Sequence, residues 1–422
     1  MKKARIALLG MGTVGIGVLE VLAKNGGMIR QREGLDIEVR KILVRDLSKK
    51  RTYDVGPGVL TDSVDEILND SEIDVVIEFM GGEDPAFDYI RRALKNGKSV
   101  VTANKEVIAK HWDVLEEEAV NSGAGLYFEA SVAAGIPIIE SLRRSLQANN
   151  ILKFMGIING TTNYILTRMT EKNLSFEDAL MEAQRLGYAE PDPTADVEGF
   201  DARFKLAILS TICFRNKVPL DQIFCEGITR ITAEDIEYAR NLGYGVKLLA
   251  IAKKYDDRIE ARVHPTFIPL SHPLYAVREA YNAIYLESDI VGNLMFYGKG
   301  AGAFPTASSV LSDIIAACKN KDSHSRTRMD DKKLGLDPNW IAEYYIRMLV
   351  ADKPGVLAEI AGLFGKNNVS LESVIQKNRG SAGATIIFIT HEAHERSLMK
   401  AIEEMKGCAS VSSIESVIRV EK

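Results

Sequence analysis

An acidic stretch that ends in a lysine is the part of the sequence best suited to chemistry. It reads GYAEPDPTADVEGFDARFK over residues 187–205, with five carboxylates inside residues 190–201 and two prolines in its first half. Three interpretations are open: a solvated loop, a metal cage, or a pocket for a ligand that carries an ammonium group. The spacing matches no calcium loop, and the prolines and the lysine disfavour a metal cage. Asp201 and Lys205 stand four residues apart on a predicted helix, so they share one face of it.

A second lysine follows a predicted strand. The motif TANKEVIAKH begins where the strand 99–102 ends, which places Thr102 and Lys105 at the carboxyl edge of a parallel sheet, where ligands bind. A lysine at that edge can carry a charge or a shifted pKa into a dry site. A surface lysine at the start of a helix is the simpler alternative.

A glycine-rich turn near the N-terminus predicts a dinucleotide site. The motif GMGTVG contains Gly10, Gly12 and Gly15, with Thr13 and Val14 before the last of them. It follows a predicted strand and opens a predicted helix, as a dinucleotide fingerprint must. Gly10 permits the tight turn, Gly12 lets the backbone approach a pyrophosphate, and Gly15 permits close packing of helix on sheet. The helix N-terminus adds a positive potential for the phosphates.

The residues after the second predicted strand bear on the choice of dinucleotide. Asp46 could accept a ribose hydroxyl of NAD, whereas Arg45 with the nearby Lys49, Lys50 and Arg51 could hold the 2′-phosphate of NADP. Asp46 stands about thirty residues after the glycine motif rather than the usual ~20, which an insertion around GGMIRQREG would explain. The pattern leans towards NADP and leaves NAD open, and a solvated basic loop is the alternative.

Strands and helices alternate along the first part of the chain. The predicted strands are 4–9, 37–44, 74–79, 99–102 and 125–128, and the predicted helices between them include 85–96 and 107–122. This alternation indicates a doubly wound parallel sheet. From about residue 134 the pattern changes to that of an α+β domain. Its predicted helices are 136–147, 163–172, 175–186 and 197–214, and its predicted strands include 154–158 and 262–268. Another amphipathic helix is predicted at 303–318.

The last part of the chain predicts a separate unit. Residues 319–337 are rich in Lys, Asp, Ser and Arg and nearly lack large apolar side chains, so they predict a linker. After them the predicted order is strand, helix, strand, strand, helix, strand, at 344–350, 357–366, 370–376, 384–390, 395–405 and 411–420. This is the ferredoxin-like βαββαβ arrangement.

Composition argues against several classes of protein. The net charge of −5 disfavours a nucleic-acid surface as the main function, and no apolar run approaches the length of a membrane span. The four cysteines form no CxxC motif, which favours free thiols and a location in the reducing cytoplasm. The 422 residues suffice for two or three domains.

Taken together, the motifs resemble those of the homoserine dehydrogenase family over nearly the whole chain. They are GMGTVG, VTANK, EASVAAGIPII, GIINGTTNYIL, GYAEPDPTADVEGFDARFK and GKGAGAFPTASSV. The one departure is AFPTASS, where the family often has GMPTAS. In the last unit, DKPGVLAEIAGLF and NNVSLESV look like an ACT regulatory domain.

The resemblance implies an α/β chain with three domains. We expect a Rossmann-type NAD(P)-binding domain at 1–133 and 303–320, an α+β substrate-binding and dimerisation domain at 134–302, a linker at 321–342, and an ACT domain at 343–422. In that family the acidic loop holds the substrate.

The resemblance also implies roles for single residues. The substrate would be surrounded by Glu190, Asp196, Asp201, Gly160 and Thr161, and Lys205 would move the proton on its oxygen. Lys105 would lie between cofactor and substrate. Gly187 and Gly302 would touch the cofactor. The family's monovalent-cation loop matches EASVAAGIPII, so backbone carbonyls would bind sodium or potassium at Glu129, Val132, Ala134 and Ile136.

The expected activity is the NAD(P)-dependent interconversion of L-homoserine and L-aspartate 4-semialdehyde, in threonine, methionine and isoleucine biosynthesis. L-Threonine is the expected regulator at the ACT domain, and a homodimer or homotetramer is the expected assembly. Two alternatives stay open: a regulatory protein that senses dinucleotide and amino acid without catalysis, and an aspartate-semialdehyde dehydrogenase. The second needs a cysteine nucleophile, and no cysteine here lies in a suitable turn. The ACT domain could also serve dimerisation alone.

Overall fold

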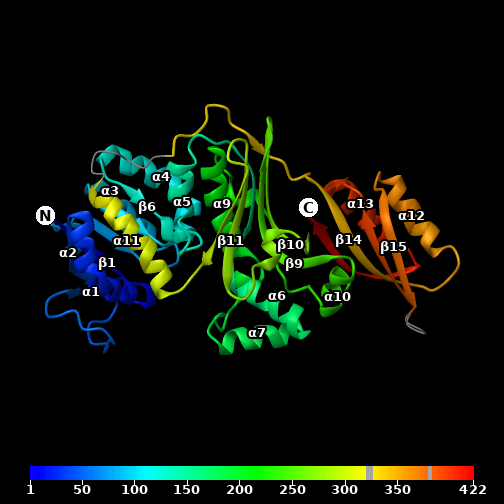
Figure 1. Cartoon of the computed structure of the whole chain (residues 1–422), viewed down its shortest axis with the longest axis horizontal. Coiled ribbons are helices and arrows are strands. Elements are labelled where there is room, and N and C mark those ends of the chain that lie inside the picture. The colour runs from blue at the N-terminus through cyan, green and yellow to red at the C-terminus, as the bar shows by residue number, and fades with distance from the viewer. Residues whose placement is uncertain (320–326, 379–382) are drawn as a thin grey trace. The chain divides into compact units, whose positions relative to one another are not determined.

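The computed structural model describes residues 1–319, 327–378 and 383–422 (Figure 1). The chain folds into two compact units, each assembled from separate stretches of sequence. Unit 1 consists of Met1–Leu152, Phe204–Asp221 and Asn282–Lys333. Unit 2 consists of Lys153–Arg203, Gln222–Tyr281 and Leu334–Lys422.

Unit 1 contains a six-stranded parallel sheet with the strand order β3-β2-β1-β4-β5-β6. Its strands are β1 (Lys2–Leu9), β2 (Leu35–Leu43), β3 (Leu60–Thr61), β4 (Val75–Glu78), β5 (Ser99–Thr102) and β6 (Leu126–Tyr127). The chain starts in the middle of the sheet, runs to one edge, and then fills the other edge from β4 outward. The predicted doubly wound sheet is therefore confirmed, and its order is the Rossmann order.

Four helices cover this sheet (Figure 1). Helices α1 (Thr13–Glu33) and α11 (Ala303–Lys319) pack against each other on one face, and α3 (Ala86–Lys95) and α4 (Lys105–Ser122) pack together on the other. Apolar side chains of the strands fill the core between them, because continuous runs such as β4 are buried on both faces. The stretch GGMIRQREG forms the end of α1 and its C-cap, Gly34, so the long spacing before Asp46 reflects a helix of 21 residues.

Unit 1 also holds several short elements. They are α2 (Asp65–Leu68), a 3-10 turn (Glu129–Ser131), α5 (Ile138–Glu140), a π-helical turn (Ser141–Ser145), and the strands β11 (Tyr281–Ser288, in unit 1 from Asn282) and β12 (Asn293–Lys299). The single helix predicted over 136–147 is thus short and irregular. Pro137, which has no backbone N–H, precedes its first residue.

Unit 2 contains a second sheet, with the strand order β7-β9-β10-β18-β14-β16-β15. These strands are β7 (Ile151–Ile157, in unit 2 from Lys153), β9 (Tyr244–Lys254), β10 (Arg258–Pro269), β18 (Val411–Val420), β14 (Ile341–Val350), β16 (Ala384–Thr390) and β15 (Leu371–Asn378). Three short strands lie beside it: β8 (Phe224–Cys225), β13 (Gly335–Leu336) and β17 (Ala393–His394). Strand β13 pairs with β10, so part of the predicted linker belongs to this sheet, while 320–326 lies outside the described residues.

The helices of unit 2 fall into two groups. Helices α6 (Gly160–Lys172), α7 (Phe176–Arg185), α8 (Thr194–Val197), the start of α9 (Phe200–Phe214) and α10 (Ala233–Asn241) accompany β7 to β10. Helices α12 (Val356–Lys366) and α13 (Glu395–Lys406) pack on β14 and β16 in one apolar core. The order β14-α12-β15-β16-α13-β18 confirms the predicted βαββαβ arrangement.

One predicted helix is divided in two. The sequence predicts a single helix over 197–214, but the structure has α8 and α9, separated at Gly199. Gly199 has φ +81°, a left-handed conformation that a glycine adopts without strain and that stops an α-helix. The break therefore places Asp196 and Lys205 on two different helices, α8 and α9.

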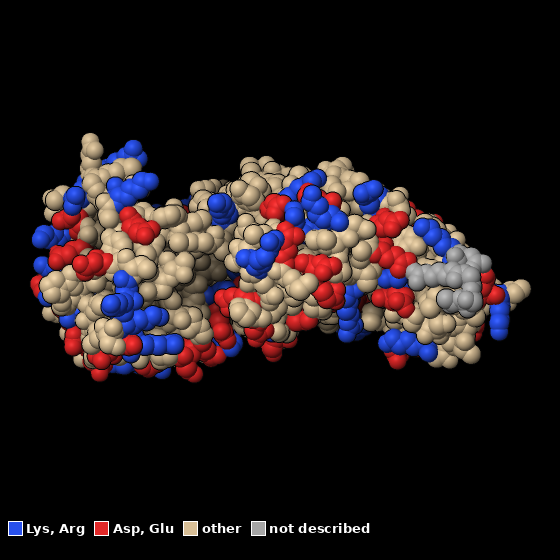
Figure 2. Space-filling model, turned by 90° about the horizontal axis from the view of Figure 1, so that it is seen from below, with Lys and Arg blue, Asp and Glu red and all other residues tan. Residues whose placement is uncertain are grey.

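The surface carries both signs of charge. On the face shown in Figure 2, basic and acidic side chains are interspersed, so that face has no extended area of a single sign. In the described ranges, no helix combines the length and the apolar composition that crossing a lipid bilayer would demand. The four cysteines are all free thiols, as predicted.

Candidate active site

The glycine motif forms the turn between β1 and α1. Gly10 has φ +114°, and its N–H donates to the Leu43 carbonyl over 3.1 Å. Gly12 is the N-cap of α1, followed by Thr13 and Val14 as the first helical residues. A Cβ atom on Gly15 would lie 2.7 Å from the Gly10 carbonyl oxygen, so no larger residue fits there. The tight turn at Gly10 and the close packing at Gly15 thus agree with the motif, while the approach of a pyrophosphate to Gly12 stays a prediction.

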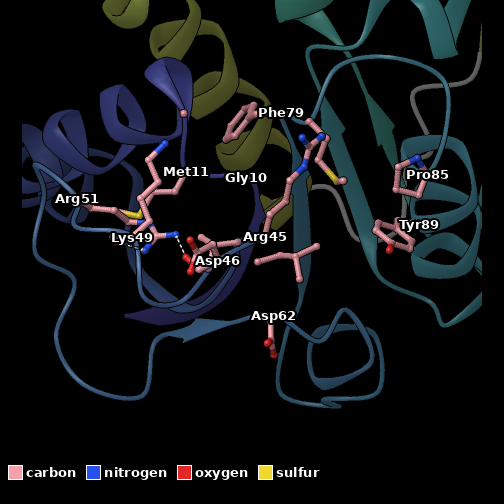
Figure 3. Close-up of a pocket in the computed structure, with 14 residues that line it drawn as sticks. Gly10, Met11, Arg45, Asp46, Lys49, Arg51, Asp62, Phe79, Pro85 and Tyr89 are labelled. Atoms are coloured by element: carbon pink, nitrogen blue, oxygen red, sulfur yellow. Dashed lines mark hydrogen bonds between the residues drawn. The ribbon is translucent and has the colours of Figure 1, made fainter.

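A pocket of about 530 Å³ opens beside this turn (Figure 3). Fourteen residues line it: Gly10, Met11, Gly12, Leu43, Val44, Arg45, Asp46, Lys49, Arg51, Asp62, Phe79, Met80, Pro85 and Tyr89. Its size suits a cofactor, and it lies at the carboxyl ends of β1, β2 and β4. Figure 3 shows the charged group of Asp46, Lys49 and Arg51 on one side of the pocket and Pro85 and Tyr89 on the other. These residues fit a dinucleotide.

The charged loop after β2 is ordered by its own hydrogen bonds. The Asp46 carboxylate accepts from the Ser48 hydroxyl (2.6 Å) and the Ser48 N–H (2.8 Å), which lowers the Asp46 pKa. Arg51 donates to the backbone carbonyls of Asp46 (2.5 Å) and Lys49 (2.8 Å). One Asp46 oxygen is therefore occupied within the loop, while three cationic side chains line the pocket. The pocket therefore presents both an acidic group and basic groups to a ligand.

A buried network fixes the start of α4, where Lys105 is the first residue. Glu78, fully buried at the end of β4, accepts from the Thr102 hydroxyl (2.6 Å) and the Met80 N–H (2.6 Å). Burial raises the Glu78 pKa against the effect of these donors. Thr102 in turn accepts from the Asn104 N–H, and the Asn104 side chain caps α4. Thr102 is thus a buried support rather than part of the pocket lining, and Lys105 is half-buried beside it.

Glu78 was missed by the sequence analysis, although one carboxylate in an otherwise apolar strand is a signal. We expect Glu78→Ala to unfold more readily than Glu78→Gln, by about 1–3 kcal/mol, because only alanine leaves two buried donors without an acceptor. Urea unfolding of both variants measures the difference. The exposed Glu66 gives a matched pair, Glu66→Ala and Glu66→Gln, which should differ little. Equal stability of the two Glu78 variants would contradict the assigned support.

Two of the predicted substrate acids converge in unit 2. The Asn159 amide donates one hydrogen bond to Asp196 (2.6 Å) and one to Asp201 (2.8 Å). Asn159 is also the N-cap of α6, where its oxygen accepts from the Thr162 N–H over 2.8 Å. Asp201 is only 4% exposed and Asp196 is half-buried. One neutral amide thus brings two carboxylates to one point, and carboxylates are the groups that bind an ammonium.

The other acids of the stretch have different surroundings. The Asp192 carboxylate accepts from the Thr194 hydroxyl (2.6 Å) and N–H (3.1 Å), so its contacts are local to the turn before α8. Glu190 is exposed, and the structure does not bring it to the Asn159 cluster by any hydrogen bond. Gly187 has φ +77° at the end of α7 and does not line the pocket of unit 1. Of the five carboxylates, the structure therefore brings together Asp196 and Asp201.

Helix α6, which begins at Gly160, is held tightly in place. A Cβ atom on Gly160 would lie 2.9 Å from the Ala280 carbonyl oxygen, and the Thr161 hydroxyl donates to the Tyr188 carbonyl over 2.7 Å. Deeper in the unit, the buried Lys247 ammonium donates to Asn163 over 2.9 Å, and burial lowers the Lys247 pKa to about 7. The turn that contains Asn159 is thus held by the packing of Gly160 against Ala280 and by the hydrogen bond from Thr161 to Tyr188. Gly160 and Thr161 contribute through packing and a backbone contact.

Lys205 lies on α9, one turn after Asp201, as predicted. Its side chain is half-buried. The neighbouring Phe204 ring lies 5.9 Å from the Lys110 ammonium, whereas Phe200 is 38% exposed. Gly302, with φ +118°, precedes α11, and its carbonyl accepts from the Thr306 N–H over 3.0 Å. It does not line the pocket.

The predicted cation loop is buried, and most of its carbonyls already accept hydrogen bonds. The carbonyls of Glu129, Ala134 and Ile136 accept from the Val132 N–H, the Ser309 hydroxyl and the Ile138 N–H, respectively. The Glu129 carboxylate accepts from two N–H groups that open α5, and burial raises its pKa to about 7. Each carbonyl keeps a second lone pair. In the part of the chain that the structure describes, no group of three or more His, Cys, Asp or Glu side chains could hold a metal ion.

Comparisons with known proteins agree with this geometry. A family model described as Homoserine dehydrogenase matches residues 137–315, its NAD binding domain matches 10–129, and an ACT domain matches 344–409. The homoserine dehydrogenase of Corynebacterium glutamicum is 44% identical over 99% of this chain and 95% of its own. A crystal structure of a homoserine dehydrogenase from Thiobacillus denitrificans aligns with a TM-score of 0.94 and 40% identity, over 100% of this chain and 99% of that one. A hyperthermophilic archaeal homoserine dehydrogenase in complex with NADPH aligns with a TM-score of 0.65 and 29% identity, over 77% and 100%.

Proposed function

The chain belongs to the homoserine dehydrogenase family of oxidoreductases, and from that premise we propose that it interconverts L-homoserine and L-aspartate 4-semialdehyde with NADP as its preferred cofactor. The observation that carries the proposal is the Asn159 amide, which draws Asp196 and Asp201 together. Homoserine is a zwitterion with a hydroxyl group, so its ammonium requires carboxylates at a fixed place. Glu190, Gly160 and Thr161 complete the proposed substrate loop.

The proposed chemistry separates into a hydride and a proton. When bound, a nicotinamide cofactor would supply the hydride acceptor for C4 of homoserine in oxidation and the hydride donor in reduction. The neutral amine of Lys205 takes the proton from the hydroxyl oxygen as the aldehyde C=O forms, and donates it in the reverse direction. Lys105, held at the start of α4 by the Asn104 cap, is the second catalytic lysine of the proposal. Thr13, Val14, Gly15, Gly187 and Gly302 belong to the proposed cofactor contacts.

A single assay tests the activity. L-Homoserine added to the protein with NADP should produce absorbance at the reduced-nicotinamide band, and L-aspartate 4-semialdehyde with NADPH should remove it. A protein that only senses dinucleotide and amino acid would bind both and give no change. An aspartate-semialdehyde dehydrogenase would require phosphate for turnover, so the assay in phosphate-free buffer separates that reading as well.

Three cations in the pocket support NADP over NAD. Arg45→Gln should weaken NADPH binding by about 10- to 100-fold, since a charge-assisted bond to phosphate is worth about 1.5–3 kcal/mol. NADH binding should change by less than about threefold, because NADH lacks that phosphate. Fluorescence titration of both cofactors measures this. Lys50→Gln, in the same loop but outside the pocket lining, is the control. Equal weakening of NADH and NADPH by Arg45→Gln would place the arginine elsewhere on the cofactor.

The ACT domain supports regulation by an amino acid, and L-threonine is the proposed inhibitor. Initial rates measured against rising threonine concentration test this assignment. No inhibition up to saturating threonine, with unchanged oligomeric state, would leave threonine unassigned and favour a role of the domain in dimerisation. The homodimer or homotetramer, the cytoplasmic location and the pathway remain predictions.

A monovalent cation at residues 129–136 also remains a prediction. Its support is a buried loop whose carbonyls each keep one lone pair, as sodium or potassium would require. Rates measured after exchange into a tetramethylammonium buffer, and again after sodium or potassium is added back, test it. Unchanged rates in the three buffers would remove the cation from the proposal.

A further inference from the structure

The last strand of the ACT domain also belongs to the sheet of the substrate-binding part of unit 2. Strand β18 pairs antiparallel with β14, and at its end Arg419 and Val420 pair in parallel with Thr266 and Phe267 of β10 (Figure 1). The Glu421 N–H continues this pairing with a 2.9 Å bond to the Phe267 carbonyl. Backbone hydrogen bonds therefore join the two parts of the unit.

Arg419 donates hydrogen bonds to one carboxylate of the ACT domain and to one carboxylate of the substrate-binding part of unit 2. Its side chain is 4% exposed and donates over 2.5 Å to Glu395, which opens α13 of the ACT domain. Its other terminal nitrogen donates to Glu226, and its guanidinium lies 4.9 Å from the centre of the Phe224 ring. Phe224 and Glu226 belong to residues 224–228, which we call the strap.

The strap holds the backbone of the acidic stretch. The Glu226 N–H donates to Val263 of β10 (2.8 Å), which fixes the strap to the sheet. The Cys225 thiol donates to the Glu198 carbonyl (3.3 Å), and the Ile228 N–H donates to the Val197 carbonyl (2.8 Å).

At Gly227 the backbone of the strap lies directly against the backbone of the acidic stretch. A Cβ atom on Gly227 would lie 2.1 Å from the Val197 carbonyl oxygen and 2.5 Å from the Glu198 Cα atom, so the strap passes directly against the stretch. Residues 197–199 belong to the four-residue connection, 197–200, between Asp196 and Asp201. A shift of the strap must therefore move the connection between the two acids.

We propose that Glu226 and Arg419 are positioning residues for the Asp196–Asp201 pair, and that the ACT domain sets the affinity for the amino-acid substrate through them. The contacts form one path, from Glu395 through Arg419 and Glu226 to the strap, and from the strap to residues 197–199. The proposal rests on the proposed function for the identity of the substrate. It goes beyond that function in naming the route by which the ACT domain reaches the substrate loop.

Kinetics of Glu226→Gln test the route. Glu226 is partly exposed, with 32% of its side chain accessible, so the variant is expected to fold. The KM for homoserine should rise about tenfold, while kcat and the KM for NADP stay within about twofold. Arg419→Lys, which keeps the charge but loses the two-sided geometry, should give a smaller rise in the same parameter.

The chain offers a matched control. Glu234 also pairs with a buried ACT arginine, Arg347, over 3.0 Å, and its side chain is 35% exposed, but it lies on α10 and not on the strap. Glu234→Gln should leave the homoserine KM unchanged. If Glu226→Gln leaves this KM unchanged, or if both variants raise it equally, the Glu226–Arg419 pair only stabilises the fold. The proposal then fails.

Hydrogen exchange gives a readout that needs no substrate. Glu226→Gln should speed amide exchange about tenfold or more in residues 194–201 and 224–228, and Glu234→Gln should do so only in α10. Unchanged exchange in 194–201 of Glu226→Gln would overturn the route even if the kinetics changed. If the wild-type protein shows no homoserine-dependent turnover, the proposed function fails, while the exchange experiment still decides whether the ACT domain controls the acidic stretch.

Discussion

Lys205→Ala should lower kcat for homoserine oxidation by about 10²–10⁴-fold while leaving NADPH binding intact. The range is that of a general acid–base group removed from a positioned site. Lys205 stands one turn after Asp201 on α9. Most apolar side chains of α9 are buried, so the packing of this helix fixes the position of the lysine backbone. Lys205 is not among the residues that line the cofactor pocket, which is why the dinucleotide should still bind. Steady-state rates and a fluorescence titration with NADPH measure the two quantities.

A matched substitution shows whether the effect is specific. Lys217→Ala removes an exposed lysine beyond the end of the same helix, where it pairs with Asp113, and should keep nearly full turnover. Lys205→Arg keeps the charge but cannot act as a neutral base, so its kcat should fall as well. Near-normal turnover of Lys205→Ala would show that another group moves the proton, and Lys105→Ala would then be the next variant.

The glycine motif and the parallel sheet could be predicted because local rules dictate them. A buried parallel strand reads as a continuous apolar run, and only glycine tolerates the turn at Gly10 and the close approach at Gly15. The βαββαβ unit was equally readable, since each of its elements has a clear period. Strand β9 was missed because its apolar run, YGVKLLAIAKK, has no period that separates a buried strand from a buried helix.

The acidic stretch shows where local rules end. Spacing alone could not separate Asp196 and Asp201 from Asp192, because side-chain direction in a loop depends on contacts from elsewhere. The partner that selects the pair is Asn159, about forty residues earlier in the chain. The NGTT motif pointed to that turn, but its neighbours Gly160 and Thr161 were named instead. The helix break at Gly199 was also hidden, since a glycine within an apolar helical pattern is compatible with either outcome.

The same distant contacts explain why the strap and the end of the chain could not be assigned from sequence. Residues 224–228 have no motif, and Arg419 follows an ordinary strand pattern. Their importance comes from burial of charge, which a sequence does not display. Arg347 is another buried charge that the sequence does not reveal. It lies on β14 of the ACT domain and donates over 2.8 Å to the buried Asp235 of α10. Buried ion pairs of this kind fix the arrangement of two elements because breaking one partner leaves the other charge uncompensated.

Glu421→Gln should destabilise unit 2, where Glu421 follows β18 beside β10, by about 3 kcal/mol at pH 7. Burial alone would raise the Glu421 pKa, but attraction to Arg262 and Lys253 outweighs it and lowers the pKa from 4.5 to about 2. The carboxylate bonds to Arg262 and lies 2.9 Å from the Lys253 ammonium, with Lys153 at 3.9 Å. A depression of this size corresponds to about 3 kcal/mol of stability. Glutamine would remove the charge that Lys253 and Lys153 face and would leave Arg262 with Glu260 as its remaining acidic partner.

The sign of the pH dependence follows from the direction of the shift. Because the folded-state pKa lies below the ordinary value, Glu421 contributes its stability above about pH 4.5 and loses it as the pH falls towards 2. The difference in urea-unfolding free energy between wild type and Glu421→Gln should therefore be largest near pH 7 and shrink steadily below pH 4.5. Glu392→Gln, at an exposed position of the ACT domain, should show no such difference. A Glu421→Gln deficit that stays constant from pH 7 to pH 3 would mean that shape rather than charge holds this residue in place.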